Sequence, residues 1–327
     1  MKNILLIGGA GYIGTVVTDY LLRKNYNVKI IDNLIYNSTS SKTFLKKNKK
    51  VSFLNLDIRN IKSDNMFLKN IDAAILLAGL VGDPITKKYP QLSEEINSIG
   101  NKCTIDAIAN SGIKKLIYIS TCSNYGLIPD DTKANEEYIL NPISLYAKSK
   151  VNIEKYILSK NIKDFSTTIL RFATAFGESP RMRFDLTINE FIYEMLHYRK
   201  LLVFDPDTWR PYCHVLDFAR LIELVINSKN ELVNNQVFNA GSDENNFTKR
   251  QIVNLISKYV DGCNIDFQDH GKDPRNYKVD FKKVRETLNF QPNFNVQNCI
   301  VDLINFIKQF KKINKKEYGN YYIGQNE

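Results

Sequence analysis

Short apolar runs alternate with longer amphipathic stretches through the first half of the chain. The runs are rich in branched residues and have the length of buried strands, and most intervening stretches have helical spacing. Strands are expected at residues 3–7, 28–31, 51–56, 73–78, 116–119 and 167–170. This alternation predicts βαβ units and a parallel sheet, with ligands bound at the carboxyl ends of the strands near the reversal in strand order.

The alternation weakens after about residue 171, where loops such as 177–180 and 205–207 separate helices. We therefore expect a sheet domain over residues 1–171 and a smaller C-terminal substrate-binding lobe over 172–212 and 241–327. Residues 213–240 are expected to return to the sheet domain, as a helix at 214–227 and a strand at 236–239. The predicted class is α/β.

A glycine-rich turn joins the first predicted strand to a helix that begins near Tyr12. Its sequence, Ile7-Gly8-Gly9-Ala10-Gly11-Tyr12-Ile13-Gly14, contains two overlapping glycine fingerprints. Glycines there permit a tight turn and let backbone N–H groups approach a pyrophosphate, whose charge the helix N-terminus favours. The turn predicts a Rossmann-type doubly wound parallel sheet. Its cofactor-binding residues are Gly8, Gly11, Tyr12, Ile13 and Gly14.

An acidic residue, Asp32, ends the second predicted strand, near the spacing expected for a ribose-binding carboxylate. A carboxylate there accepts from a ribose 2′-hydroxyl and repels a 2′-phosphate. Residues 33–37, which begin with Asn33, contain no arginine or lysine to offset that repulsion, although Lys42 could reach in. NAD is therefore favoured over NADP. The alternative is that Asp32 caps a turn or helix.

The pattern Tyr-x-x-x-Lys occurs three times, as Tyr20/Lys24, Tyr146/Lys150 and Tyr156/Lys160. Only Tyr146 follows a hydroxyl, Thr121, at the end of the fifth predicted strand. We expect Tyr146 to be a general base, with Lys150 on the same helical face lowering its pKa and Thr121 binding the reacting oxygen. Free tyrosine titrates near 10, so its pKa must fall by roughly three units, which the adjacent ammonium and the nicotinamide cation can supply. The alternative role of Thr121 is to satisfy a loop amide.

The net charge of +10 fits either nucleic acid or anionic small substrates. The basic runs 46–50 and 311–316 lack interleaved aromatics, so small anionic substrates are favoured and nucleic acid is not expected. No apolar run approaches the roughly 18 residues of a membrane span, and the first strand begins without a leader pattern. We expect a cytoplasmic protein that makes no membrane contact. The five cysteines read as reduced thiols, and the scattered histidines His197, His214 and His270 predict no metal site.

Together these motifs resemble the extended short-chain dehydrogenase/reductases, in the NAD-dependent epimerase/dehydratase branch that acts on nucleotide sugars. The resemblance covers nearly the whole chain and implies that Thr121, Tyr146 and Lys150 form the active triad. It also implies a homodimer or a dimer-based homo-oligomer. Further cofactor contacts that it implies are Asp57 and Ile58 beside the adenine, Ala78 and Gly79 along the cofactor, and Asn97 at the start of the Asn-x-x-Gly helical motif.

The resemblance extends to residues that would bind the sugar nucleotide. Thr174 occupies the position of the family's substrate-binding asparagine. The segment 209–215 matches the family's Arg-x-Tyr-x-His-Val pattern, in which Arg210 would clamp a pyrophosphate and Tyr212 is the tyrosine. Arg181, Arg183 and Arg275 are further anion-binding candidates. For these arginines the alternative is a structural or solvated charge.

Family membership implies oxidation of the sugar at C4 by hydride transfer to NAD. Sugar 4,6-dehydratases carry Asp-Glu after the triad threonine, whereas this chain has Cys122-Ser123, so 4,6-dehydration is not expected. Cys122 is either a replacement acid or, as we favour, a packed thiol. The run 176–186 is similar to a sub-branch that includes GDP-heptose 4-dehydrogenases. We predict a nucleotide-sugar 4-epimerase or 4-dehydrogenase of surface glycan biosynthesis; the alternatives are a 4-keto-sugar reductase and a non-catalytic NAD-binding sensor.

Overall fold

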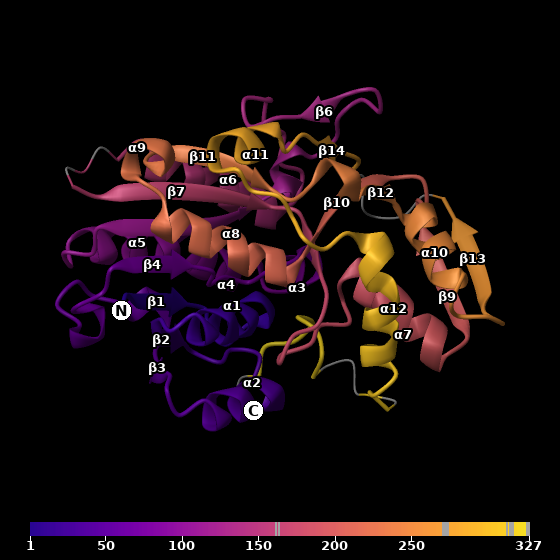
Figure 1. Cartoon of the computed structure of the whole chain (residues 1–327), viewed down its shortest axis with the longest axis horizontal. Coiled ribbons are helices and arrows are strands. Elements are labelled where there is room, and N and C mark those ends of the chain that lie inside the picture. Colours follow the sequence, from indigo (N-terminus) through magenta and orange to yellow (C-terminus); the bar gives the residue numbers. More distant parts are fainter. Residues whose placement is uncertain (161, 163, 270–274, 312, 314–316, 325–327) are drawn as a thin grey trace.

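The computed structural model describes residues 1–160, 162, 164–269, 275–311, 313 and 317–324. Within these residues the centre of the molecule is a seven-stranded parallel sheet in the order β11-β7-β5-β4-β1-β2-β3 (Figure 1). The strand order reverses between β1 and β4, which confirms the predicted doubly wound, Rossmann-type fold. The strands are β1 (Asn3–Ile7), β2 (Asn27–Asp32), β3 (Ser52–Asn55), β4 (Ala73–Leu76), β5 (Lys115–Thr121), β7 (Ser166–Phe172) and β11 (Gln236–Ala240).

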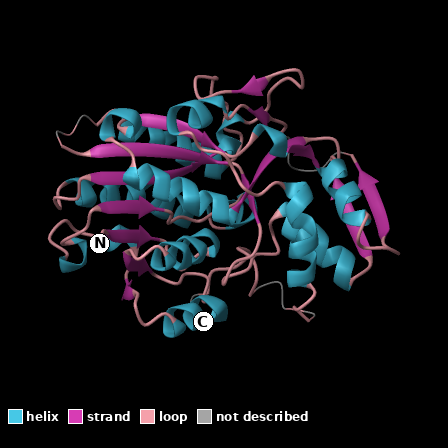
Figure 2. Cartoon of the chain, viewed as in Figure 1, coloured by secondary structure: helices cyan, strands magenta, loops and turns pink. Residues whose placement is uncertain are grey.

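Both faces of the sheet are covered, which explains why its strands read as continuous apolar runs (Figure 2). In β1, Ile4 and Leu6 pack into one core and Leu5 and Ile7 into the other. The helices of the first face are α1 (Tyr12–Arg23), α8 (Val215–Asn227) and α11 (Lys282–Leu288). Those of the second are α3 (Asp83–Lys88), α4 (Pro90–Glu94), α5 (Asn101–Ala109) and α6 (Leu145–Leu158).

The observed strands begin and end within two residues of the predicted ones. The difference that matters most for the site is at β5. This strand runs two residues past its predicted end at 119, so Thr121 is its last residue. The predicted helix at 214–227 is α8, and the Nδ1 atom of His214 caps it by accepting from the Leu216 amide at 3.2 Å. The predicted strand at 236–239 is β11, which pairs with β7. The domain boundary at residue 171 stays a prediction.

A second core lies beside the sheet and forms the lobe. Tyr12 and Val16 of α1 pack into it, so the first helix of the sheet also anchors the lobe. The helices of this core are α7 (Thr187–His197), α10 (Lys249–Ser257) and α12 (Val296–Ile307). Its strands form a three-stranded sheet, β12 (Asn246–Thr248), β10 (Trp209–His214) and β8 (Thr174–Phe176), and a parallel pair, β9 (Lys200–Phe204) and β13 (Asn264–Gln268).

Shorter elements connect these layers. A parallel pair is formed by β6 (Lys133–Ala134) and β14 (Lys278–Val279), and the remaining α-helices are α2 (Thr39–Lys47) and α9 (Asn230–Val233). The single turns are η1 (Ile58–Asn60), η2 (Met66–Leu68), η4 (Cys122–Tyr125) and η5 (Asp243–Asn245), with a π-helix η3 (Glu95–Gly100). After the lobe, residues 317–324 return to the sheet, where the amide of Gly324 donates to the Ile35 carbonyl at 2.8 Å. None of the helices in the described ranges has the length and apolar content that a bilayer crossing requires.

Candidate active site

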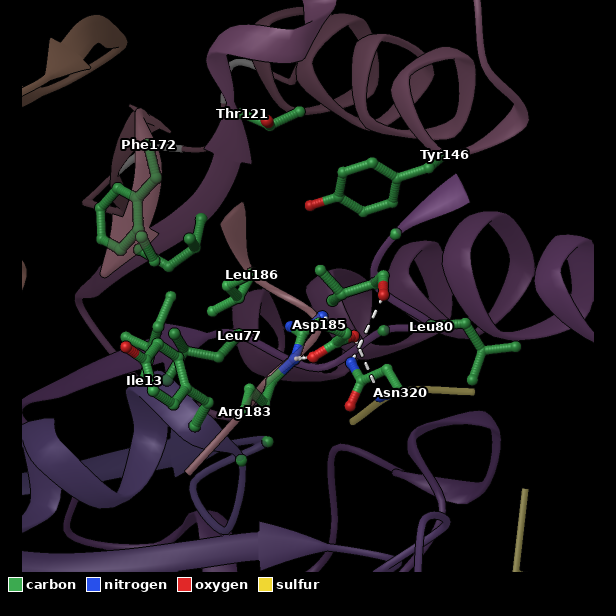
Figure 3. A pocket seen from close by; sticks show the side chains of 18 of the residues that line it. Ile13, Leu77, Leu80, Thr121, Tyr146, Phe172, Arg183, Asp185, Leu186 and Asn320 are labelled. Atoms are coloured by element: carbon green, nitrogen blue, oxygen red, sulfur yellow. Dashed lines mark hydrogen bonds and ion pairs between the residues drawn. The ribbon is translucent and has the colours of Figure 1, made fainter. Parts of the chain in front are cut away.

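A cavity of about 580 Å³ lies at the carboxyl ends of β1, β4 and β5, between the sheet and the lobe (Figure 3). This is where a doubly wound sheet binds its ligands. Nearly every predicted site residue reaches it. Those lining it are Gly8, Gly11, Tyr12, Ile13, Gly14, Asp32, Asn33, Asp57, Ile58, Ala78, Gly79, Thr121, Tyr146, Lys150, Thr174, Arg181, Arg183, Arg210 and Arg275.

The glycine turn fits a dinucleotide because no side chain could occupy it. Gly8 has φ of +87°, and a Cβ there would lie 2.6 Å from the Ala78 amide nitrogen. A Cβ on Gly14 would lie 2.6 Å from the Gly8 carbonyl oxygen. Gly11 is the N-cap of α1 and provides no side-chain cap, so the first amides of the helix can bind a phosphate.

The carboxylate of Asp32 lies beside this turn. It accepts from the amides of Ala10 at 3.0 Å and Leu34 at 2.8 Å, so it does serve as a local cap, and it also lines the cavity. Burial raises the pKa of Asp32, and the two amides act against that rise. An oxygen that is held by amides and faces the cavity can still accept from a ribose hydroxyl.

Asp57 and Asn33 line the end of the cavity where the resemblance places the adenine. The Asn33 amide donates to Asp57 Oδ2 at 2.8 Å, which joins the loops after β2 and β3. Burial alone would raise the pKa of Asp57, but Arg59 and Asn33 hold it below the usual value. The predicted contact Asn97 does not line the cavity. Its buried amide instead accepts from the Leu80 amide at 2.7 Å and donates to the Leu80 carbonyl at 2.9 Å, which fixes the loop after β4.

Thr121 and Tyr146 point into the same part of the cavity from different elements (Figure 3). Thr121 ends β5, and its Oγ1 accepts from the Ser123 amide at 3.1 Å, so its hydroxyl proton remains available to a ligand. Tyr146 stands in the first turn of α6, which Ser144 caps by accepting from the Ala147 amide. One turn later, the buried Nζ of Lys150 donates to the Ile119 carbonyl at 2.7 Å. The sheet and α6 therefore bring all three predicted catalytic residues to one place.

The charges around Tyr146 differ from the sequence-based expectation. Burial of its phenol raises the pKa of Tyr146, and the guanidinium groups of Arg183 and Arg275 act against that rise. Burial also lowers the pKa of Lys150 to about 7. Removal from water disfavours the charged form of Lys150, and the nearby Glu154 carboxylate acts against this effect. The charges of the protein alone do not lower the pKa of Tyr146, and the part that the nicotinamide cation is expected to play stays a prediction.

The arginines of the lobe fall into two groups along the cavity. Arg183 donates two hydrogen bonds to Asp185, at 2.8 and 2.6 Å, and Arg181 lies nearer Asp32. At the other end, Arg210 donates to the Arg275 carbonyl, at 2.5 Å, and its guanidinium lies 5.1 Å from the centre of the Tyr277 ring. These fixed donors suit phosphate oxygens.

Tyr212 does not reach the cavity. It is fully buried in the lobe core, although it stands only two residues after Arg210 in β10. Tyr212 is absent from the cavity lining, so the structure does not support its predicted role as a substrate ligand.

The two residues after Thr121 have opposite orientations. Cys122 is buried in the sheet core, and its Sγ lies 3.1 Å from the Arg171 carbonyl oxygen. Burial raises the pKa of the Cys122 thiol far above its usual value, so it is a packed thiol, as favoured from the sequence. Ser123 faces the cavity, where its Oγ lies 3.1 Å from the Tyr277 hydroxyl and 3.3 Å from Arg275 Nη1.

A buried ionic network joins β5 to α6 and β7. Glu154 of α6 pairs with Arg171 of β7 at 2.7 Å, and both side chains are almost completely enclosed. Glu154 also accepts from Ser120 and from Asn124, which brackets Thr121. The network links β5, α6 and β7. Because β5 and α6 carry the three predicted catalytic residues, it fixes the relative positions of those side chains.

Several lining residues were not predicted from the sequence. Ser123 could have been found, since it follows the triad threonine, and Tyr277 lies two residues after the predicted Arg275. Nothing in the local sequence marks the C-terminal pair Asn320 and Tyr321. Further lining side chains without a predicted role are Tyr36, Ser38, Ser41, Asp83, Asp185, Glu190 and Lys249.

No group of three or more histidine, cysteine or acidic side chains is placed to hold a metal ion among the residues that the structure describes. His270 and part of the basic run 311–316 lie outside those residues.

The fold and this site define a class of nicotinamide-dependent enzyme. The sequence pattern of the NAD dependent epimerase/dehydratase family matches residues 4–241, and the chain belongs to this family. This confirms the resemblance found from the sequence, and the predicted cofactor, NAD, is confirmed with it.

Known relatives match over almost the whole length. A UDP-glucuronate 4-epimerase of Thermodesulfobacterium geofontis is 26% identical over 94% of this chain and 97% of its own. The crystal structure of UDP-glucuronic acid 4-epimerase from Bacillus cereus, in complex with UDP-glucuronic acid and NAD, has a TM-score of 0.81 at 24% identity, covering 94% of this chain and 99% of that one. DesIV, a dTDP-glucose 4,6-dehydratase from Streptomyces venezuelae with NAD and TYD bound, has a TM-score of 0.84 at 20% identity, covering 94% and 97%. These two structures show that the fold is shared.

Proposed function

We propose that this protein is an NAD-dependent 4-epimerase of a nucleoside-diphosphate sugar. The observation that carries the proposal is that Thr121 and Tyr146 face a single cavity that joins the glycine turn to the arginines of the lobe. The likeness to a relative named UDP-glucuronate 4-epimerase supports C4 as the reacting carbon.

The residues of the chain can divide the work of oxidising a carbinol. The Tyr146 phenolate accepts the proton of the sugar hydroxyl, and Thr121 donates a hydrogen bond to the same oxygen and so holds it for the transfer. Lys150 and Arg183 provide positive charge near Tyr146. NAD supplies the hydride acceptor, and its oxidised ring carries a positive charge. For epimerisation, the keto sugar would have to present its other face to the returning hydride, and Tyr146 would then give its proton back to the C4 oxygen.

Arg210 and Arg275 are the residues that we assign to the sugar diphosphate. Both line the cavity on the Ser123 and Tyr277 side, and guanidinium groups offer paired donors to phosphate oxygens. The homodimer or dimer-based oligomer and the role in surface glycan synthesis stay predictions that rest on the resemblance, and the cytoplasmic location stays a prediction from the sequence pattern.

The lining argues against 4,6-dehydration. The position directly after Thr121 is a thiol that faces the sheet core, and the next residue, Ser123, has no acidic proton to give at neutral pH. A 4-dehydrogenase is the second candidate, because the run 176–186 is similar to that sub-branch. It would have to release reduced cofactor after every turnover.

Incubation with a panel of UDP-, GDP-, dTDP- and CDP-sugars tests the proposal. We expect a C4-epimeric product by NMR, with no lasting absorbance at about 340 nm from reduced nicotinamide. Net absorbance and a mass loss of roughly two hydrogens would identify a dehydrogenase instead. If neither NAD nor any sugar nucleotide raises the melting temperature, the assignment as an enzyme of this kind fails.

A further inference from the structure

The C-terminal segment 317–324 crosses from the lobe to the sheet beside the adenosine end of the cavity. At the lobe, the Tyr318 carbonyl accepts from the Phe184 amide at 2.7 Å. At the sheet, the Lys88 Nζ lies 3.7 Å from the centre of the Tyr322 ring, Ile323 packs against the second core of the sheet, and the Gly324 amide donates to the Ile35 carbonyl. The segment is therefore attached at both ends.

Asn320 is the central contact of this crossing, and it lines the cavity together with Tyr321. Its backbone amide donates to Asp185 Oδ2 at 3.0 Å, and its side-chain amide donates to the Val81 carbonyl at 3.4 Å (Figure 3). Its Oδ1 accepts from Arg181 Nη2 at 2.8 Å. One residue thus joins the segment to the lobe and to the loop after β4.

Arg181 is held over the loop that follows Asp32. Its guanidinium lies 5.0 Å from the centre of the Tyr36 ring, and Asp32 is near enough to interact with it electrostatically. Asp185 directs both oxygens to Arg183, so it does not neutralise Arg181 by direct pairing. Within the described residues, the bond to Asn320 is the only side-chain hydrogen bond that the Arg181 guanidinium makes. A guanidinium has five N–H donors, so most of those of Arg181 remain for a ligand.

Burial, together with the nearby charge of Arg183, lowers the pKa of Arg181 to about 10. A cation in this position is costly unless an acceptor or an anion enters the cavity beside it. The ligand that must fill the space between Arg181 and Asp32 carries ribose hydroxyls and phosphate oxygens, both of which accept from a guanidinium. The adenosine half of NAD has this chemistry.

We infer that Arg181 and the C-terminal segment 317–324 form part of the NAD site and hold the adenosine half of the cofactor from the lobe side. Arg181 is then a cofactor ligand and not the substrate ligand expected from the sequence, and Asn320 is its positioning residue. NAD can leave only when the segment detaches from the loops after β2 and β4.

Release of labelled NAD from the loaded protein tests this inference. The variants are Arg181→Met, Asn320→Ala and a chain that ends at residue 316; the controls are Arg275→Met, from the other arginine group, and a chain that ends at Gly324. We expect release at least about ten-fold faster from Arg181→Met and from the shortened chain, and a smaller increase from Asn320→Ala. Both controls should stay within about two-fold of the unaltered protein.

Two results would overturn the inference. One is release within about two-fold of the unaltered rate from both Arg181→Met and the chain that ends at 316. The other is an Arg181→Met protein that keeps its NAD but loses affinity for UDP-glucose, which would return Arg181 to the substrate. Thermal unfolding of each NAD-free variant shows whether it is folded. If the shortened chain is not, Arg181→Lys and Asn320→Ala decide, and Arg181→Lys should release NAD more slowly than Arg181→Met.

Discussion

The Nζ atom of Lys150 lies 5.9 Å from the centre of the Tyr146 ring, on the same side of α6. Their pKa values nevertheless do not describe a lysine that is always protonated beside a tyrosine that is always deprotonated. Burial raises the pKa of Tyr146 and lowers that of Lys150 to about 7. Near neutral pH the charge of Lys150 can therefore change, whereas the Tyr146 phenol needs a further positive charge, such as that of oxidised nicotinamide, to lose its proton.

Lys150 should make the stability of the NAD-free protein depend on pH. Between its folded pKa of about 7 and its ordinary value of 10.5, the unfolded chain binds a proton that the folded chain does not, so stability rises with pH. From pH 7 to about pH 9 the rise should be about 2 kcal/mol. Urea unfolding at both pH values measures it. Lys150→Met should remove this component, and an equal rise in that variant would contradict the assignment.

Replacing Tyr146 by phenylalanine should abolish turnover while leaving NAD binding nearly intact. The change deletes the proton acceptor and leaves the glycine turn untouched, so kcat should fall by roughly 10²–10⁴-fold. Initial rates and NAD titration measure the two effects. Tyr156→Phe is the matched control on the same helix, because its hydroxyl bonds to Asp106 at 2.7 Å away from the cavity, and its rate should be unchanged. A Tyr146→Phe enzyme with normal turnover would refute the role of the phenol.

Glu154→Gln should destabilise the protein by about 3–5 kcal/mol, because it leaves the Arg171 charge buried without its partner. The midpoint of urea unfolding measures the loss. Asp19→Asn, which breaks an exposed pair with Arg23, should leave that midpoint nearly unchanged. Equal effects of the two substitutions would show that the buried pair has no special role.

Tyr277→Phe should weaken binding of the sugar nucleotide without changing affinity for NAD. The hydroxyl that is lost contacts Ser123, at the end of the cavity assigned to the sugar diphosphate. Loss of about 1 kcal/mol corresponds to a roughly five-fold higher KM. Ser123→Ala should have a similar effect, and the double variant should cost less than the sum because the two hydroxyls contact each other. A loss of NAD affinity instead would place Tyr277 at the cofactor.

Much of the sheet and the cofactor turn could be predicted because each depends on neighbouring residues. The glycines from Gly8 to Gly14 specify a backbone path, and Asp32 follows at the end of the next strand. The spacing of Tyr146 and Lys150 follows from one helix. These patterns are local, so they can be read without knowing which elements meet.

The roles of the lobe residues could not be predicted in the same way. Arg181 and Arg275 look alike as loop arginines, yet one lies with Asp32 and the other with Asp83 and Ser123. Asn97 keeps the position of its motif but bonds to the backbone of the cavity wall. Which end of a cavity a loop side chain reaches depends on how the lobe packs on the sheet.

From the sequence alone came the parallel sheet, the dinucleotide turn, the choice of NAD and the three predicted catalytic residues that line one cavity, because apolar periodicity and backbone constraints act over a few residues. Only the tertiary structure separated the two groups of arginines, turned Cys122 into the core and Ser123 into the cavity, and brought residues 317–324 back across the nucleotide end. Those outcomes are contacts between segments far apart in the chain, and no short stretch of sequence encodes them.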